Sequence, residues 1–338
     1  MRNNNFALLR HLAAIGVLLR HSIHHLNINS GWIVDLNITK YLPGVSVFFI
    51  MSGFLLALTY NKNPNLQHYS KNRMVRIFPV LWISLFISVL TLYYFGFVEF
   101  NTKFFSWVLS QATIVQIYNI EMFRDFGVGV PNGSLWTIFV LLTFYILLPI
   151  LFLIYRKSIW MIIVLFCVSF FFWIYDQTNS TTLFIDKLLH ITIIPYLFIF
   201  IIGMGFYKYF NYLKKIFEDK FLFWLMIFII TEFVTDYLKY EPSILLYILR
   251  WILFSFMVFS FSFSFKHLSN LILKGKDYSY GIYIYHMLVI NVFVQLDLYG
   301  EMKYFYYTIL MTIFISILSW HFIEKPIVLW SKHKNSKN

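Results

Sequence analysis

The sequence predicts an all-helical bundle that crosses a membrane about ten times, with both termini in the cytoplasm. Of its 338 residues, 60% are hydrophobic and 12% are charged, whereas a soluble domain has about 25% charged residues. The second observation is a series of apolar runs close to the length of about 20 residues that a membrane helix needs. The third is the uneven distribution of basic residues between these runs. The composition excludes a large soluble protein, because so few charges do not cover a water-exposed surface.

Ten apolar runs account for the predicted spans, and several carry one ionisable group, so nine to eleven crossings are compatible with the sequence. The runs lie near 6–26, 43–60, 78–98, 134–155, 158–175, 189–207, 221–238, 243–265, 279–297 and 304–324. In the longer connection at about 99–133, the stretch Phe104 to Ile117 predicts a short helix along the membrane interface. No linker or repeat divides the chain. We therefore expect a single membrane domain over residues 1–338, with a short basic tail at about 327–338.

The basic residues in the connecting segments predict the orientation. With the N-terminus inside, 18 lysines and arginines fall on the cytoplasmic side and six on the outer side. Cytoplasmic loops carry such an excess, which favours N-in, C-in and an even number of spans. The net charge of +12 is then mainly a topology signal. It does not indicate nucleic-acid binding, which requires one contiguous basic face.

Arg10 and His21 lie within the first span, where ionisable groups are candidates for function. Eleven positions separate them, which places them about 20° apart around a helix and about 16 Å apart along it. A cation near the inner side and an imidazole near the outer side suit a path between the leaflets, with His21 handling protons. Alternatively, Arg10 reaches the interface and His21 binds a neighbouring helix. A metal site at His21 and His25 is disfavoured, because no carboxylate or cysteine lies nearby in the sequence.

Three other sites have both structural and functional interpretations. Glu232 and Arg250 lie at matching depths in the seventh and eighth spans, and we favour a structural ion pair. Arg73 and Arg76 lie on one helical face where the third span begins, which suits phosphate binding or simply positive-inside topology. Glu324 ends the tenth span and by itself predicts a charge facing water.

In chain order, these signals resemble the membrane acyltransferase-3 family, the bacterial O-acyltransferases of surface glycans. The resemblance runs from about residue 6 to 326. It rests on six motifs: Arg10 and His21 with ten residues between them; Val47-Phe48-Phe49-Ile50-Met51-Ser52-Gly53-Phe54-Leu55; Arg73 and Arg76 before Ile77-Phe78-Pro79; Asn132-Gly133-Ser134-Leu135-Trp136-Thr137; Tyr278 to His286; and Phe322-Ile323-Glu324-Lys325-Pro326. The order of all six is more specific than any single motif.

The resemblance implies transfer of an acyl group, usually acetyl, from cytoplasmic acyl-CoA to a hydroxyl of an O-antigen, capsule, exopolysaccharide or lipid-linked glycan. It implies a multi-pass protein of the bacterial inner membrane, with no metal and no permanently bound cofactor. His21, with Arg10, would be catalytic, and Arg73 and Arg76 would bind acyl-CoA. The remaining matched positions would line the pocket for substrate: Phe48, Phe49, Ser52, Gly53, Phe54, Trp136, His286 and Glu324.

One position departs from the family pattern. Leu141 stands where the family commonly has glutamate, five places after the tryptophan, which puts the substrate class in question. The chain carries no fused hydrolase-like domain of the kind found in many members, so we expect a stand-alone form. A transporter or flippase of a lipid-linked saccharide is the alternative function, since intramembrane charges also serve transport.

Overall fold

The structure, a computed structural model, describes residues 4–35, 43–178, 189–237 and 243–335. Every regular element in these ranges is a helix. Their bounds are α1 Phe6–His25, α2 Trp32–Asp35, α4 Gly44–Lys62, α5 Leu66–Tyr94, α6 Thr102–Ala112, η1 Glu121–Phe123, α7 Leu135–Lys157, α8 Ile159–Thr178, η2 Ile194–Tyr196, α10 Leu197–Lys208, α11 Phe210–Phe217, α12 Phe221–Tyr237, α13 Ile244–Phe263, α14 Leu268–Leu273, α15 Ser279–Gln295, α16 Met302–Ser319, η3 Trp320–Glu324 and α17 Lys325–Asn335.

Each of the ten predicted spans contains a helix. Among the described residues, seven helices are long and apolar enough to cross a membrane: α1, α4, α5, α7, α8, α13 and the continuous Met302–Ser331 segment. The helices in the other three predicted spans, at Ile194–Lys208, α12 and α15, are shorter. The number of crossings and the orientation therefore stay predictions. Arg2, Lys40, Lys187, Lys239 and the end of the basic tail lie outside the described residues.

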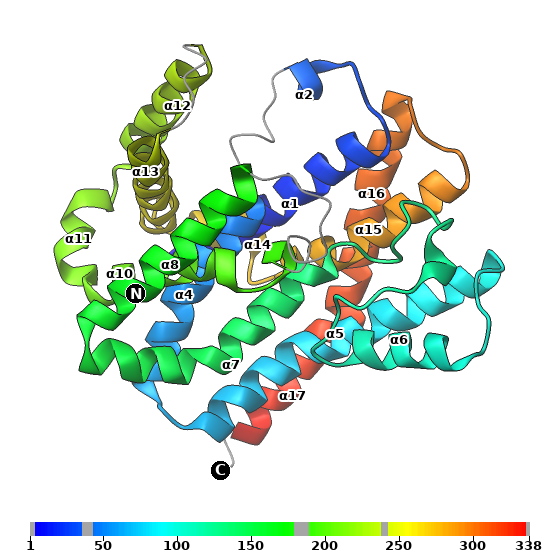
Figure 1. Cartoon of the computed structure of the whole chain (residues 1–338), viewed down its shortest axis with the longest axis horizontal. Helices are drawn as coiled ribbons and strands as arrows, with labels where there is room; N and C mark the ends of the chain where they lie inside the picture. The colour runs from blue at the N-terminus through cyan, green and yellow to red at the C-terminus, as the bar shows by residue number, and fades with distance from the viewer. Residues whose placement is uncertain (1–3, 36–42, 179–188, 238–242, 336–338) are drawn as a thin grey trace.

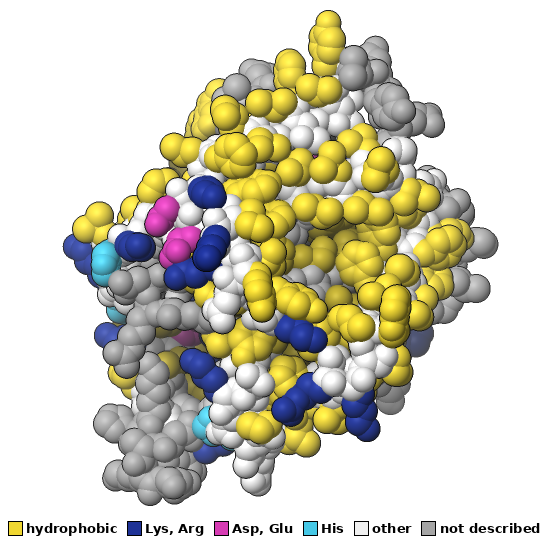
Figure 2. All heavy atoms as spheres, turned by 90° about the vertical axis from the view of Figure 1, so that its left-hand side faces the viewer, with side chains coloured by type: hydrophobic (Ala, Val, Ile, Leu, Met, Phe, Trp, Pro, Cys, Tyr) yellow, Lys and Arg dark blue, Asp and Glu magenta, His cyan; other side chains and the backbone are white. Residues whose placement is uncertain are grey.

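The surface of the bundle supports a multi-pass membrane protein. Side chains such as Trp160, Phe171, Leu222 and Phe233 are between 62% and 74% exposed. Figure 2 shows one face of the molecule on which apolar side chains predominate, with Lys and Arg gathered on its lower and left-hand parts. A soluble monomer rarely exposes apolar patches of this extent, whereas lipid covers such a surface favourably.

Helix α1 runs through the middle of the bundle and contacts α4, α13, α14, α15 and α16 (Figure 1). Helix α4 packs most extensively against α10. Two glycines allow this approach. A Cβ atom on Gly53 would lie 2.1 Å from the carbonyl oxygen of Phe200, and one on Gly203 would lie 2.1 Å from that of Ile50. Small residues let membrane helices pack with their backbones this close.

The short helix predicted over Phe104 to Ile117 is present as α6, but it ends at Ala112, and its place along the membrane interface stays a prediction. Its first turn is capped by the Asn101 side chain, which accepts a hydrogen bond from the Phe104 amide at 3.0 Å. Its buried face packs on α5 through Phe104 and Trp107. The pair α12 and α13 stands to one side of the bundle (Figure 1). Glu232 on α12 accepts a hydrogen bond from Arg250 Nε on α13 at 2.6 Å, so the two side chains form an ion pair.

The expectation that a helix ends at Glu324 is wrong. The chain passes through a π-helical turn at Trp320–Glu324 and continues as α17, which packs beside α5 (Figure 1). Pro326 lacks an N–H donor and its ring would clash with the carbonyl four residues earlier in a regular helix. The wider π turn just before it accommodates the proline without ending the helix. As a result Glu324 is half-buried and does not simply face water.

Candidate active site

A cavity of about 490 Å³ lies between α1, α4, α5, α7 and α15. The N-terminal parts of α1 and α5 and the last turn of α4 form its polar end, which is lined by Arg10, Arg73, Arg76 and Lys62. Its apolar part is lined by Phe48, Phe49, Ile138, Leu141, Tyr145 and Tyr283, with the Ser52 hydroxyl among them. The cavity thus joins a cationic end to an apolar channel, an arrangement that suits a ligand with an anionic end and a long uncharged arm.

Two of the predicted pocket residues have packing roles instead. Gly53 faces the backbone of α10 at Phe200. Phe54 is fully buried and packs its ring against Phe6 and Phe259 at centroid distances of 5.4 and 5.1 Å. Because α4 turns Phe48 and Ser52 to the cavity, Gly53 faces α10 and the ring of Phe54 packs away from the cavity. The motif therefore serves both the cavity and the helix contact.

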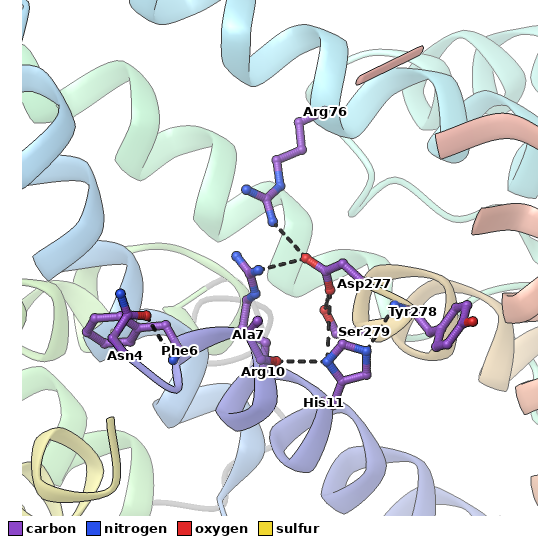
Figure 3. Close-up of polar contacts among 9 residues, drawn as sticks. All are labelled: Asn4, Phe6, Ala7, Arg10, His11, Arg76, Asp277, Tyr278 and Ser279. Carbon is purple, nitrogen blue, oxygen red and sulfur yellow. Dashed lines mark hydrogen bonds and ion pairs between the residues drawn. The ribbon is translucent and has the colours of Figure 1, made fainter. Parts of the chain in front are cut away.

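A carboxylate that the sequence did not single out holds the arginines together. Asp277 Oδ2 lies 2.6 Å from Arg10 Nη2 and 3.3 Å from Arg76 Nη2, and Figure 3 shows both guanidinium groups pointing at it. Ser279 Oγ donates to Asp277 Oδ1 at 2.6 Å. Burial alone would raise the pKa of Asp277, but Arg10 and Arg76 outweigh it and hold the pKa below its ordinary value. Asp277 is therefore ionised and orients the two arginines.

The sequence offered little signal for Asp277. It follows Lys276 in the connection before α15, 267 residues from Arg10, and an acidic residue in a loop is ordinary. Beside it, His11 is fixed by two hydrogen bonds. Its Nδ1 donates to the Ala7 carbonyl at 2.8 Å, and its Nε2 accepts from the Tyr278 amide at 2.9 Å (Figure 3). The first bond orients the ring within α1, and the second connects α1 to the start of α15, next to Asp277.

Two arginine N–H groups at this end lack partners. Nε of Arg10 and Nε of Arg73 are buried and have no hydrogen-bond partner within the described part of the chain. Arg73 also lies over the ring of Tyr145, with its Cζ atom 5.9 Å from the centroid. A buried charged donor without a partner is costly. An anionic ligand oxygen in the cavity would satisfy both groups.

A second cavity of about 580 Å³ lies on the other side of the same arginines. Arg10, Arg73, Arg76 and Tyr280 line both cavities. Glu324 lines the second cavity together with Asp277 and not the first, and it accepts a hydrogen bond from Ser319 Oγ at 3.2 Å. Glu324, which was predicted to line the substrate pocket, therefore lies in the second cavity, across the arginines from the first.

The remaining predicted residues lie beyond the apolar part of the first cavity. His21 Nδ1 is 2.8 Å from His286 Nε2, and His286 Nδ1 is 2.7 Å from the carbonyl oxygen of Tyr283, a cavity residue. Trp136 packs against the rings of His190 and Tyr196 at 5.5 and 5.4 Å. The structure thus joins His21 to His286. Trp136 does not line the first cavity, but its partner Tyr196 packs against the ring of the cavity residue Phe49 at 5.6 Å.

A metal site does not form at the histidines in the described ranges. His21 and His25 have ring centroids 5.7 Å apart, and within those ranges no group of three or more histidine, cysteine or acidic side chains is arranged to hold a metal ion.

Comparison with known proteins gives consistent matches over nearly the whole chain. Residues 3–324 match a family model described as "Acyltransferase domain". A 345-residue alignment with "Nodulation protein 10" from Rhizobium leguminosarum bv. viciae is 30% identical and covers 96% of this chain and 92% of that protein. An "O-acetyl transferase" from Shigella phage Sf6 is 26% identical over 305 residues, 86% of each chain. No solved structure gives a significant match.

Proposed function

Because the chain belongs to the acyltransferase domain family and is a membrane acyltransferase, we propose that it moves an acetyl group from acyl-CoA to a glycan hydroxyl. The observation that carries the donor assignment is the cationic end of the first cavity. There Arg10, Arg73 and Arg76 converge, and two of their N–H groups are buried without partners in the described residues. Guanidinium groups bind phosphate oxygens through paired, charge-assisted hydrogen bonds.

In this proposal the phosphates of acyl-CoA bind the arginines and the uncharged arm extends along the apolar part of the cavity. Phe48, Phe49, Ile138 and Tyr283 line that path. At 1.5 Å per residue, His21 lies about 16 Å along α1 from Arg10. Arg10 is therefore too distant to contact the reacting carbonyl, and we assign it to donor binding and not to the chemical step. The thioester would reach His21 by threading, without an acyl-enzyme.

His21 is the proposed general base. It takes the proton of the acceptor hydroxyl while that oxygen attacks the thioester carbonyl. The new C–O bond forms, the C–S bond breaks, and the departing sulfur receives the proton from His21. General-base assistance of this kind contributes about 10²–10⁴-fold to the rate. The topology proposed with it places both termini in the cytoplasm of a bacterial inner membrane, so that donor and acceptor approach from opposite sides.

The proposed acceptor is a hydroxyl group. The phage relative is named an O-acetyl transferase, which supports a hydroxyl as the acceptor. We propose a cell-surface or lipid-linked glycan. The family match and the O-acetyl transferase relative favour an acyltransferase over the flippase alternative.

His21→Ala tests the proposal, with His24→Ala as the matched control. His24 lies three residues further along α1, in its last turn, and is exposed. In cells that lack the native protein, His21→Ala should abolish acetylation of the surface glycan, measured by mass spectrometry, while the membrane fraction keeps its normal amount of protein. His24→Ala should acetylate normally. Acetylation that persists in His21→Ala would remove His21 from its proposed role.

A further inference from the structure

We infer that His286 is a positioning residue that sets the protonation of the His21 ring, so that His21 Nε2 is the nitrogen free to accept a proton. The catalytic consequence rests on the proposed function, whereas the hydrogen-bond arrangement does not. The two histidines come from α1 and α15. Their ring centroids are 5.0 Å apart, with the planes tilted by 31°.

The arrangement starts at a backbone carbonyl. His286 Nδ1 lies 2.7 Å from the carbonyl oxygen of Tyr283. A carbonyl oxygen accepts hydrogen bonds and cannot donate them. His286 Nδ1 must therefore carry the proton of this bond.

The other nitrogen of His286 then has a lone pair if the ring is neutral. The ring is fully buried, with an exposure of 0%. Its neighbours in the described residues are the His21 ring, the Tyr283 ring, the backbone of Tyr283 and Ile282, and, further away, His25. No carboxylate is among these neighbours, so a protonated ring would be a buried cation without a counter-charge, which is strongly disfavoured. His286 Nε2 is therefore an acceptor.

This acceptor determines the state of His21. His21 Nδ1 lies 2.8 Å from His286 Nε2, and a bond between them requires one proton. Because His286 Nε2 has none, His21 Nδ1 donates. A neutral His21 then keeps its lone pair on Nε2, which has no hydrogen-bond partner in the described part of the chain. A nitrogen in this state is what a general base requires, and an acceptor on the opposite nitrogen plays the orienting part seen in catalytic triads.

The same contact also links the base to the donor cavity. Tyr283 lines that cavity, and its hydroxyl is hydrogen-bonded to Thr137, which holds the residue on α15 against α7. Its carbonyl holds His286, one helical turn further along. The ring of His21 is thus oriented through His286 by the wall along which the acyl chain would lie.

The arrangement can be read directly by NMR. Protein labelled with ¹⁵N in its histidine rings and reconstituted in nanodiscs gives ring-nitrogen shifts that differ between protonated and bare nitrogens. The His21 signals are identified by their loss in His21→Gln. We expect wild-type His21 to have a protonated Nδ1 and a bare Nε2. A wild-type His21 protonated at Nε2 would overturn the inference, whatever the enzymatic result.

Kinetics test the consequence through two replacements. His286→Phe keeps a buried ring but removes the acceptor, so kcat should fall about 10- to 100-fold, while KM for acetyl-CoA changes less than about twofold because the arginines are untouched. His286→Gln offers an amide oxygen near the position of Nε2 and should restore kcat to within about threefold of wild type. A wild-type kcat in His286→Phe, or equal losses in both variants at normal thermal stability, would contradict the inference.

These results separate the inference from the proposed function. If His21→Ala stays active, the general-base assignment fails, yet the NMR signals still report whether His286 sets the His21 ring. If His286→Phe does not fold, the wild-type NMR result and the His286→Gln kinetics decide.

Discussion

The contact between α4 and α10 allows a sharp prediction about two glycines on the same helix. Gly203 and Gly205 are two positions apart on α10. A Cβ atom on Gly203 would lie 2.1 Å from the carbonyl oxygen of Ile50 and 2.8 Å from the amide nitrogen of Phe54, both backbone atoms. A Cβ atom on Gly205 would have no atom within 4 Å outside its own helix. Gly203→Ala and Gly205→Ala therefore differ in packing while sharing the same gain in helix propensity.

The size of the difference follows from these distances. The shared gain from Gly to Ala is about 1 kcal/mol. Gly203→Ala must also push two helix backbones apart, and overpacking of this kind costs about 1–3 kcal/mol or more. With an unfolding entropy of about 2.1 cal/mol/K per residue, 1 kcal/mol shifts the Tm of a chain of 338 residues by about 1.4 °C. Gly205→Ala should therefore melt at or above the wild-type temperature, and Gly203→Ala a few degrees below Gly205→Ala.

The assay is thermal unfolding of the purified protein in one detergent, followed by tryptophan fluorescence at a fixed scan rate, because unfolding of such a protein is often irreversible. Gly203→Ala should also shorten the half-life at a temperature just below the transition. Equal transitions for the two variants would refute the close contact between α4 and α10, and with it the packing role assigned to Gly53.

Three further predictions concern charged residues. Asp277→Asn should lower Tm at pH 7, because two guanidinium groups lose their counter-charge. The folded pKa of Asp277 lies below its ordinary value. The stabilisation by its ionised form is therefore present above about pH 4 and is lost as the pH falls through the lowered pKa, so the Tm values of wild type and Asp277→Asn should converge in acid. A Tm difference that stays constant with pH would contradict this prediction. Arg73→Gln should raise KM for acetyl-CoA about 10- to 100-fold, because a charge-assisted hydrogen bond to the donor is lost. Arg156 is exposed, so Arg156→Gln should leave KM unchanged. Equal KM values in the two variants would argue against the donor site. Arg250→Leu should destabilise the protein by about 3–5 kcal/mol, because it leaves the buried carboxylate of Glu232 unpaired. Adding Glu232→Gln to this variant should recover part of the lost stability. A double variant less stable than Arg250→Leu alone would exclude a structural ion pair.

Much of this protein was determined by local sequence. Apolar runs of about 20 residues match the length of a membrane helix, which satisfies its own backbone groups in lipid. The helical class therefore follows from the length and composition of the runs, and each predicted span contains a helix. The ion pair of Glu232 and Arg250 was also predictable, because residues at matching depths on consecutive helices meet. The family followed from the order of short motifs.

Tertiary structure decided which faces of the helices meet. His21 and His286 are 265 residues apart, and Arg10 and Asp277 are 267 apart. Their contacts depend on how far each helix is rotated and shifted along its neighbour. That rotation comes from side-chain packing over the whole interface, as at Gly53, and one chain's sequence does not show it.

The last span illustrates the same limit on a local scale. Pro326 predicts the end of a helix from sequence, but α17 has α5 to pack against. Packing there outweighs the lost hydrogen bond, and a π turn absorbs the proline. Thus the sequence by itself determined the helices, the family and the types of residue available for catalysis. Only the packed bundle decided that Asp277 orients the arginines and that His286 meets His21, because both depend on contacts between distant segments.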